Sequence, residues 1–315
     1  MSTDDAITAL IGQLPQDHSV QPYSEESLRR GLELVARPSD VFVTTVPKTG
    51  TTLLTQALHQ LRCPGDMDFE DIYQVIPWPP LSWDLGSDCD ADQRAEPRCF
   101  KTHQRLAAIT RGGRYLCSIR DPIRTTISNY KFLGPSGKDI PPLRQYSDVS
   151  DYVLNADAFV ARGMGFGASL WEYYVEFYKC RKLESVLVVV FEEMQSDLRA
   201  LLPHIAKFAG LNGAAEDAAL LDRVAAMCTK EVMMEHGDKF DESWSFERLK
   251  EVGRMPDPSG FVPAPRVTAG HGDVLSDEAL AWLDKQWALQ VTPHTGHATY
   301  ADMAKELALL PTASQ

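Results

Sequence analysis

The feature that most constrains the fold is a repeated pairing of a short apolar strand with a helix. Residues 41–46 (VFVTTV) are β-branched and mostly apolar, as in a strand buried on both faces of a parallel sheet. A Pro-Lys-Thr-Gly turn follows, and residues 51–61 (TTLLTQALHQL) then have helical spacing. We therefore expect a strand–loop–helix unit at this point.

The same pairing recurs twice further along the chain. Residues 115–119 predict a strand, Asp121-Pro122 a helix start and residues 123–132 the helix; residues 186–191 predict a third strand, before a helix over 198–208 that ends at Gly210. Such alternation predicts an α/β fold in which helices flank a central parallel sheet. No linker is evident, so we expect the 315 residues to form a single domain with a core from about 38 to 300.

Elements outside this pattern are also predicted. Ser24 is expected to cap a helix that runs to about Arg37, and Ser276 a helix that carries Trp282 and Trp287. Residues 66–98 and 134–162 carry Pro and Gly and look irregular, and loops of that length are often functional. These two segments are therefore the expected place for substrate contacts.

Charge and composition narrow the classes of function. The net charge of −13 argues against a general electrostatic grip on nucleic acid or an anionic membrane, so any anion must meet local positive groups. The start lacks the basic region of a secretory signal, and no apolar stretch reaches the ~18–20 residues of a membrane helix. We expect a cytoplasmic protein. Six scattered cysteines without a CxxC pair predict reduced thiols, with neither disulfides nor a zinc site: Cys63, Cys89, Cys99, Cys117, Cys180 and Cys228.

The turn after the first strand has the character of a phosphate-binding loop. Backbone N–H groups and the helix dipole favour an anion at the start of the helix that follows. Gly50 allows close approach, Lys48 adds a charge, and Thr51 and Thr52 offer hydroxyls. The simpler alternative is a tight turn with a solvated lysine. Because the lysine precedes the glycine, the order differs from GxxxxGK[ST] and argues against an ATP or GTP hydrolase.

Two further motifs carry chemistry. Arg120 ends the second strand and Ser128 follows eight residues later, so a guanidinium and a hydroxyl can together grip a phosphate. The alternative is a surface arginine and a helix serine. Lys101-Thr102-His103 follows a short strand-like piece, although a lone histidine is more often structural than catalytic.

Taken together, the motifs PKTGTT, RDP with its later serine, and KTH resemble those of the cytosolic-type sulfotransferases that use PAPS (3′-phosphoadenosine 5′-phosphosulfate). The resemblance implies that Arg120 and Ser128 bind the 3′-phosphate of PAPS or of its product PAP, that His103 is the general base, and that no metal is needed. It also implies a 5′-phosphosulfate loop that includes Lys48, Thr49, Gly50, Thr51 and Thr52, with Leu53 next to it at a position that faces the adenine.

Elsewhere the resemblance is looser. The run VLVVVFEEM places Phe191 where the family usually has tyrosine, and Thr229 matches a threonine near the adenine. Leu53 stands where many members have tryptophan, so we expect adenine to be held differently, through Phe191. The late glycine loop of the family corresponds here to RVTAGHG, which implies donor contacts from Arg266, Gly270 and Gly272.

The expected reaction is transfer of a sulfuryl group to a hydroxyl or amine of a small molecule. His103 would take the acceptor's proton, Lys48 would stabilise the bridging oxygen, and Lys101 the sulfuryl oxygens. Aromatic residues in or near the irregular segments are candidates for the acceptor pocket: Trp78, Trp83, Phe132 and Phe166. Trp171 and Tyr174 have helical spacing and are expected in the core.

Several alternatives stay open. Alcohol, phenol, amine and sugar acceptors all fit, and the acidic run Asp84, Asp88, Asp90 and Asp92 is either a solvated loop or a contact for a cationic acceptor. A P-loop-type kinase or NTPase, with Glu192 or Glu193 near its metal, is the second candidate activity. A catalytically inactive nucleotide-binding homologue is the third. The sequence does not indicate an oligomeric state.

Overall fold

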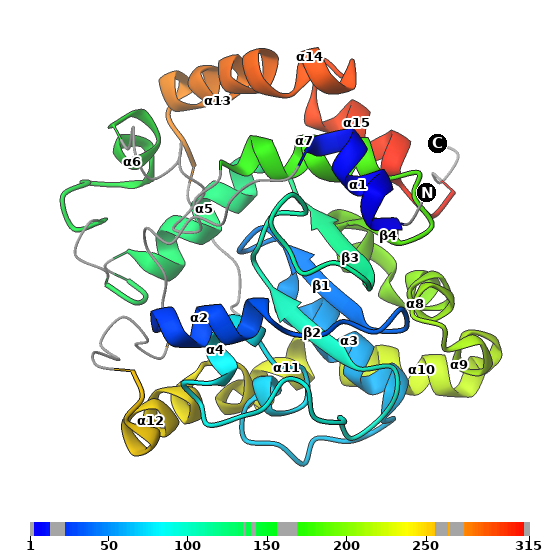
Figure 1. Ribbon diagram of the computed structural model, residues 1–315. Coiled ribbons are helices and arrows are strands. Elements are labelled where there is room, and N and C mark those ends of the chain that lie inside the picture. Colours follow the sequence, from blue (N-terminus) through cyan, green and yellow to red (C-terminus); the bar gives the residue numbers. More distant parts are fainter. Residues whose placement is uncertain are drawn as a thin grey trace.

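A sheet of four short parallel strands lies at the centre of the structure (Figure 1). The computed structural model describes residues 3–12, 23–134, 136–139, 143–155, 169–255, 264 and 274–311. Within these ranges the strand order is β2–β1–β3–β4, so β1 and β3 are central. The strands are β1 (Val41–Thr45), β2 (Cys99–Thr102), β3 (Arg114–Ile119) and β4 (Val186–Val190).

Helices surround this sheet and fill most of the chain between the strands. They are α1 (Thr3–Ile11), α2 (Glu25–Leu32), α3 (Thr51–Arg62), α4 (Pro79–Ser82), α5 (Pro122–Leu133), α6 (Val149–Asn155), α7 (Leu170–Cys180), α8 (Phe191–Phe208), α9 (Asn212–Glu216), α10 (Ala218–Met227), α11 (Lys230–Glu235), α12 (Ser243–Val252), α13 (Asp277–Gln290), α14 (Thr292–Thr295) and α15 (Tyr300–Leu307), with short 3-10 turns at Ile72–Gln74 and Gly237–Phe240. Among the helices so described, none has the length and apolar character needed to span a bilayer.

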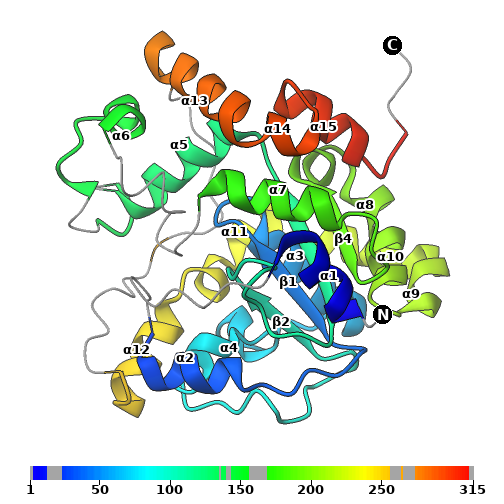
Figure 2. The ribbon, with the colours of Figure 1, turned by 45° about the horizontal axis from the view of Figure 1, so that its top comes forward.

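Both faces of the sheet are covered by apolar helices. Phe42 and Tyr115 face one layer, which includes α1 and α7, whereas Val43 and Leu116 face the other, which includes α3, α8 and α10. Figure 2 shows α1 and α7 in front of the sheet and α3 behind it. Successive strand residues point to opposite faces of the sheet, and helices bury both faces from solvent. This explains why the strands read as continuous apolar runs, and it confirms the predicted α/β architecture.

The three predicted strand–helix units are present, with small differences at their ends. α8 begins at Phe191, directly after β4, and is broken at Asp197, whose φ of −155° is not helical; the helix expected from residue 198 is its second part. Ser24 caps α2 as expected, but α2 ends at Leu32 rather than near Arg37. The segment after α2 makes a different contact, in which the Val35 N–H donates to the Asp90 carboxylate at 3.1 Å.

Candidate active site

The residues that directly follow the four strands meet at the carboxyl edge of the sheet. The strands are level with one another, because Thr44 pairs with Thr102, Thr45 with Ser118, and Ile119 with Val190. The loop after β1, His103 after β2, Arg120 after β3 and Phe191 after β4 are therefore neighbours. In open parallel sheets this edge is where ligands bind.

The loop after β1 is closed by Thr49. Its hydroxyl donates to the Val46 carbonyl at 2.7 Å and shares a hydrogen bond with Ser118 of β3 at 2.8 Å, and its backbone N–H also reaches Val46, at 3.3 Å. Thr49 is fully buried. The Thr49 side chain therefore shapes the loop, and its contact with the donor stays a prediction.

Two residues of this loop have left-handed backbone conformations. Lys48 has a φ of +70°, which is unusual for a residue other than glycine, and Gly50 has a φ of +99°. A Cβ on Gly50 would lie 2.7 Å from the Phe191 ring and 2.8 Å from Met194. Glycine is thus required here both for its conformation and for the close approach of α8.

Gly50 is also the N-cap of α3, and it brings no side chain to that position. Within the described residues no side chain caps this helix, so the N–H groups of its first turn remain available to an anion. Thr51 Oγ1 lies 2.6 Å from Thr45 Oγ1, which fixes its hydroxyl at the start of the helix. Thr52 and Leu53 lie in the same first turn and are half-buried.

Arg120 links the loop after β1 to the end of β4. Its Nη1 donates to the Lys48 carbonyl at 2.7 Å, and its guanidinium lies 4.3 Å from the centre of the Phe191 ring. Burial lowers the pKa of Arg120, an effect that nearby Glu192 opposes. The Lys48 ammonium lies 3.9 Å from the centre of the Phe132 ring. Phe191 and Phe132, expected at the adenine and the acceptor, thus lie against the two cations.

The acidic residues after β4 hold the backbone around Arg120. Glu192 accepts from the Asp121 N–H at 2.9 Å and from the Tyr300 hydroxyl at 2.6 Å. Asp121 in turn caps α5 by accepting from the Arg124 N–H. Ser128 lies two turns along this helix and is half-buried. The sequence pattern did not reveal the part that Glu192 and Tyr300 play here.

His103 is oriented by a backbone carbonyl. Its Nδ1 lies 2.9 Å from the Thr45 carbonyl oxygen, and since that oxygen can only accept, Nδ1 carries the proton in the neutral ring. Nε2 then carries the lone pair, which is the form that a general base requires. The Trp78 ring packs edge-on against the imidazole, with 5.6 Å between ring centres.

Two adjacent tyrosines of α7 bind backbone carbonyls at the carboxyl edge of the sheet. The Tyr173 hydroxyl donates to the His103 carbonyl, and the Tyr174 hydroxyl donates to the Arg120 carbonyl. Burial raises the pKa of both tyrosines well above the ordinary value, so both hydroxyls stay protonated donors. The expectation that Tyr174 belongs to the core is confirmed, and its hydroxyl also fixes a site residue.

Lys101 is buried among groups that the sequence did not associate with it. Its Nζ lies 3.2 Å from the centre of the Trp78 ring and donates to the Tyr73 hydroxyl at 3.1 Å. That hydroxyl donates to Glu242 at 3.2 Å, and Glu242 is ion-paired with Lys138. Segments far apart in the sequence therefore meet at Lys101, which is why no local motif indicated this network.

Other predicted site residues have different neighbours. Trp83 lies between Arg30 and Arg254, whose guanidinium carbons are 3.5 and 3.7 Å from its ring centre. Its contacts thus differ from those of Trp78, which touches both Lys101 and His103. Thr229 is exposed and caps α11 through the Val232 N–H, a structural use of its hydroxyl. Four predicted contacts lie outside the described residues: Phe166, Arg266, Gly270 and Gly272.

The acidic residues Asp84, Asp88, Asp90 and Asp92 bind groups of the chain itself. Asp84 is fully buried and accepts from the N–H and the hydroxyl of Ser24 at 2.7 and 2.6 Å. Asp90 accepts from Val35, Asp92 pairs with Arg37, and Asp88 accepts from the Asp90 N–H. Asp84, Asp90 and Asp92 thus bind other parts of the chain, which favours the structural alternative for this run over a contact with a cationic acceptor.

This chain matches one family model and several curated sequences, all of them sulfotransferases. A family model described as "Sulfotransferase domain" matches residues 38–252. Human sulfotransferase 4A1 is 24% identical over 202 residues, 61% of this chain and 66% of that protein, so the match spans just under two thirds of its length. Cytosolic sulfotransferase 14 of Arabidopsis thaliana is 23% identical over 264 residues, 73% and 72% of the two chains.

Solved structures with the same fold share little sequence with this chain. Mouse sulfotransferase SULT7A1 complexed with PAP aligns with a TM-score of 0.62 at 15% identity and covers 93% of this chain and 98% of that one. Retinol dehydratase in complex with androsterone and PAP aligns with a TM-score of 0.59 at 17% identity, covering 90% and 93%. These likenesses establish the fold, a parallel sheet flanked by helices.

Proposed function

The chain belongs to the sulfotransferase domain family, and from this premise we propose that it transfers a sulfuryl group from PAPS to a hydroxyl or amine of a small-molecule acceptor. The observation that carries the proposal is the gathering of Lys48, Arg120 and His103 at the uncapped N-terminus of α3. Such an arrangement supports anion binding and general-base chemistry at one edge of the sheet.

The chemistry of the co-substrate fits the residues present. PAPS supplies the reactive sulfuryl group and a nucleotide with a 5′- and a 3′-phosphate. The first turn of α3 and Lys48 suit the 5′-phosphosulfate, and Arg120 with Ser128 suits the 3′-phosphate. Arg266, Gly270 and Gly272 remain predicted contacts of the same nucleotide.

In the proposed step the acceptor oxygen or nitrogen forms a bond to sulfur while the bond from sulfur to the phosphate oxygen breaks. His103 takes the acceptor's proton at Nε2, and the bridging oxygen leaves with its electron pair on PAP. Lys48 stabilises the negative charge that develops on this oxygen, and Lys101 the sulfuryl oxygens. Trp78 holds Lys101 and His103 in place.

The structure weakens the kinase or NTPase alternative at its acidic residues. Both carboxylates that were candidates for a metal-binding role already have partners. Glu192 binds Asp121 and Tyr300, whereas Glu193 accepts from the N–H groups of Leu309 and Leu310 at 3.1 and 2.9 Å. An ATP-dependent phosphoryl transfer would need these groups released.

The acceptor is proposed by chemical class. The names of matched proteins include a 3-alpha-hydroxysteroid sulfotransferase of Cavia porcellus, and one aligned structure holds androsterone. Trp78 and Phe132 next to the catalytic edge suit an apolar body that carries one hydroxyl or amine. A panel of alcohols, phenols, amines and sugars, each incubated with PAPS, would identify the class.

The experiment on the base is His103→Ala, assayed with PAPS and the best acceptor of that panel. We expect turnover to fall by ~10²–10⁴-fold, the usual contribution of a general base. PAP affinity should be retained, since His103 is not a phosphate contact in the proposal. His294→Ala, on an exposed histidine of α14, serves as the matched control. Near-normal turnover of His103→Ala would remove His103 from the mechanism.

A further inference from the structure

A second group of chemically reactive side chains lies at the far end of α3. His59 and Cys63 are four residues apart at the end of this helix, and Asp66 follows in the turn beyond it. One ligand atom from each of the three lies within 4.8 Å of the others. The absence of a CxxC pair had predicted no zinc site, but these three residues come from a helix end and the turn that follows it.

His59 needs an explanation on its own. Its side chain is fully buried, and within the described residues neither ring nitrogen has a hydrogen-bond partner. Nε2 lies 3.2 Å from Asp66 Oδ2, near enough for an ion pair but without the alignment of a hydrogen bond. Buried polar groups in native proteins are almost always satisfied, and an ion or a water bound in place is one reason why a group lacks a protein partner.

We propose that His59, Cys63 and Asp66 bind a divalent transition-metal ion of the zinc class. Imidazole nitrogen, thiolate sulfur and carboxylate oxygen are the ligands that Zn²⁺ takes in proteins, and Zn²⁺ prefers four in a tetrahedron. Water completes the coordination. Bonds of this type set ligand atoms roughly 3.3–3.8 Å apart, so the group must close by about 1 Å. Cys63 and Asp66 are half-buried and have room to adjust.

The charges around the cluster define how the ion would bind. Arg94 donates to Asp66 Oδ2 at 2.7 Å, so it competes with a cation for this oxygen. Arg62 is also close, but its guanidinium is held by the carbonyls of Val75, Ala95 and Pro97. A thiolate and a carboxylate would neutralise the two charges of the ion. Arg94 is therefore the residue that sets the affinity.

This site is separate from the catalytic one. α3 has 12 residues, so its two ends are ~18 Å apart, and the phosphate loop lies at the other end. The ion would fasten the end of α3 to the turn at residues 63–66. It takes no part in sulfuryl transfer, and the proposal stands whether or not the catalytic assignment holds.

The test is a titration of the purified full chain with Co²⁺, a spectroscopic substitute for Zn²⁺, followed by competition with Zn²⁺. We expect one Co²⁺ per chain and a near-ultraviolet charge-transfer band from the Cys63 thiolate, which Zn²⁺ then abolishes. Cys63→Ser should remove the band, and Cys89→Ser, at another half-buried cysteine, should keep it. His59→Gln should weaken binding by at least the ~10–100-fold that outer-shell changes cost.

Arg94→Gln separates a metal site from a merely structural cluster. Because this change removes a competing cation from Asp66, it should tighten Co²⁺ binding, whereas a structural ion pair predicts only lower stability. Should the His59 variant fail to fold, Asp66→Asn provides a milder loss of one ligand. Absence of the charge-transfer band in the wild-type chain, or a band that survives Cys63→Ser, would overturn the proposal.

Discussion

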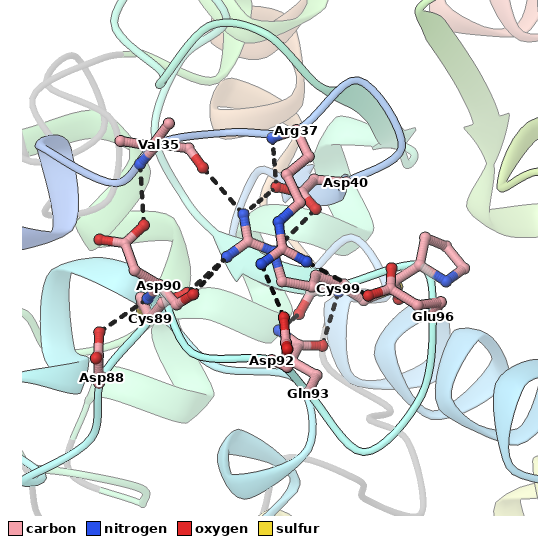
Figure 3. Close-up of polar contacts among 12 residues, drawn as sticks. Val35, Arg37, Asp40, Asp88, Cys89, Asp90, Asp92, Gln93, Glu96 and Cys99 are labelled. Carbon is pink, nitrogen blue, oxygen red and sulfur yellow. Dashed lines mark hydrogen bonds and ion pairs between the residues drawn. The ribbon is translucent and has the colours of Figure 1, made fainter.

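Each edge of the central sheet carries an arginine, and the two arginines differ in both burial and hydrogen bonding. At the amino edge, Arg98 precedes β2 and Asp40 precedes β1, and both are essentially inaccessible to solvent. All five N–H groups of Arg98 are bound, by both oxygens of Asp40 and by the carbonyls of Val35, Cys89 and Asp90. Figure 3 labels these four partners. The hydrogen-bonding capacity of Arg98 is therefore met entirely by groups of the protein.

At the carboxyl edge, Arg120 is half-buried and within the described part of the chain makes no ion pair. One N–H group binds the Lys48 carbonyl, and the plane lies against Phe191. A guanidinium has five donors, so most of those of Arg120 are left for a ligand. Arg98, the structural arginine, is buried and has all its N–H groups bound, whereas Arg120, the arginine proposed to bind phosphate, is half-buried and keeps donors for a ligand.

The largest effect should come from breaking the satisfied pair. Arg98→Met leaves Asp40 charged and buried, and we expect the free energy of unfolding to fall by ~3–5 kcal/mol. Chemical denaturation measures this free energy of unfolding. The control is Arg199→Met, which removes an exposed ion pair with Asp222 and is expected to cost under ~1 kcal/mol. The PAP affinity of the folded Arg98→Met protein should be unchanged. A large loss of PAP affinity would contradict the purely structural role of Arg98.

Arg120→Met should show the reverse pattern. Removing a charge-assisted contact to phosphate is expected to weaken PAP binding by ~10–100-fold, with little change in unfolding free energy. Calorimetric titration with PAP measures the loss of PAP affinity. The control is Arg124→Met, which changes an exposed arginine on the next helix turn. Equal PAP affinity in Arg120→Met and wild type would remove Arg120 from the donor site.

Trp78→Phe should affect turnover and spare the donor site. The indole contacts both Lys101 and His103, so a smaller ring loosens them. We expect a ~10-fold lower kcat, on the scale of a desolvated cation–π contact, with PAP affinity retained. Steady-state kinetics with PAPS decides this, and an unchanged kcat would show that Trp78 does not position the catalytic pair.

Trp83→Ala should have the smallest effect on function. Its ring touches Arg30 and Arg254, and losing two such contacts should cost about 1–2 kcal/mol of unfolding free energy. Turnover should stay within about twofold of wild type. A strong rise in KM for the acceptor would instead return Trp83 to the acceptor pocket, as the sequence had suggested.

Much of the fold could be predicted because its signals are local. Strands buried on both faces read as apolar runs, and Asp121-Pro122 marks a helix start by its own chemistry. Because parallel strands end at one edge, finding Lys48, His103 and Arg120 after three strands also predicts that they meet. These parts of the account depend on sequence order alone.

The rest depends on contacts between distant segments, which no local pattern encodes. Tyr73 reaches Lys101 from 28 residues away, Glu242 binds the Tyr73 hydroxyl from 169 residues away, and Tyr174 reaches Arg120 from α7. Trp83 lies between two arginines that are distant in sequence, a contact that its Pro-rich neighbourhood did not indicate. His59 and Cys63 are one helix turn apart, a local spacing that indicates neighbouring side chains although it contains no CxxC pair.

The central claim is that the carboxyl edge binds the nucleotide of PAPS, and one titration tests it most directly. Thermal unfolding of the purified chain would be followed with PAP and, separately, with ATP and Mg²⁺. The account predicts a marked stabilisation by PAP, ~2.7 kcal/mol at 100 times the dissociation constant, and little effect of ATP with Mg²⁺. Stabilisation by ATP with Mg²⁺ and none by PAP would contradict it.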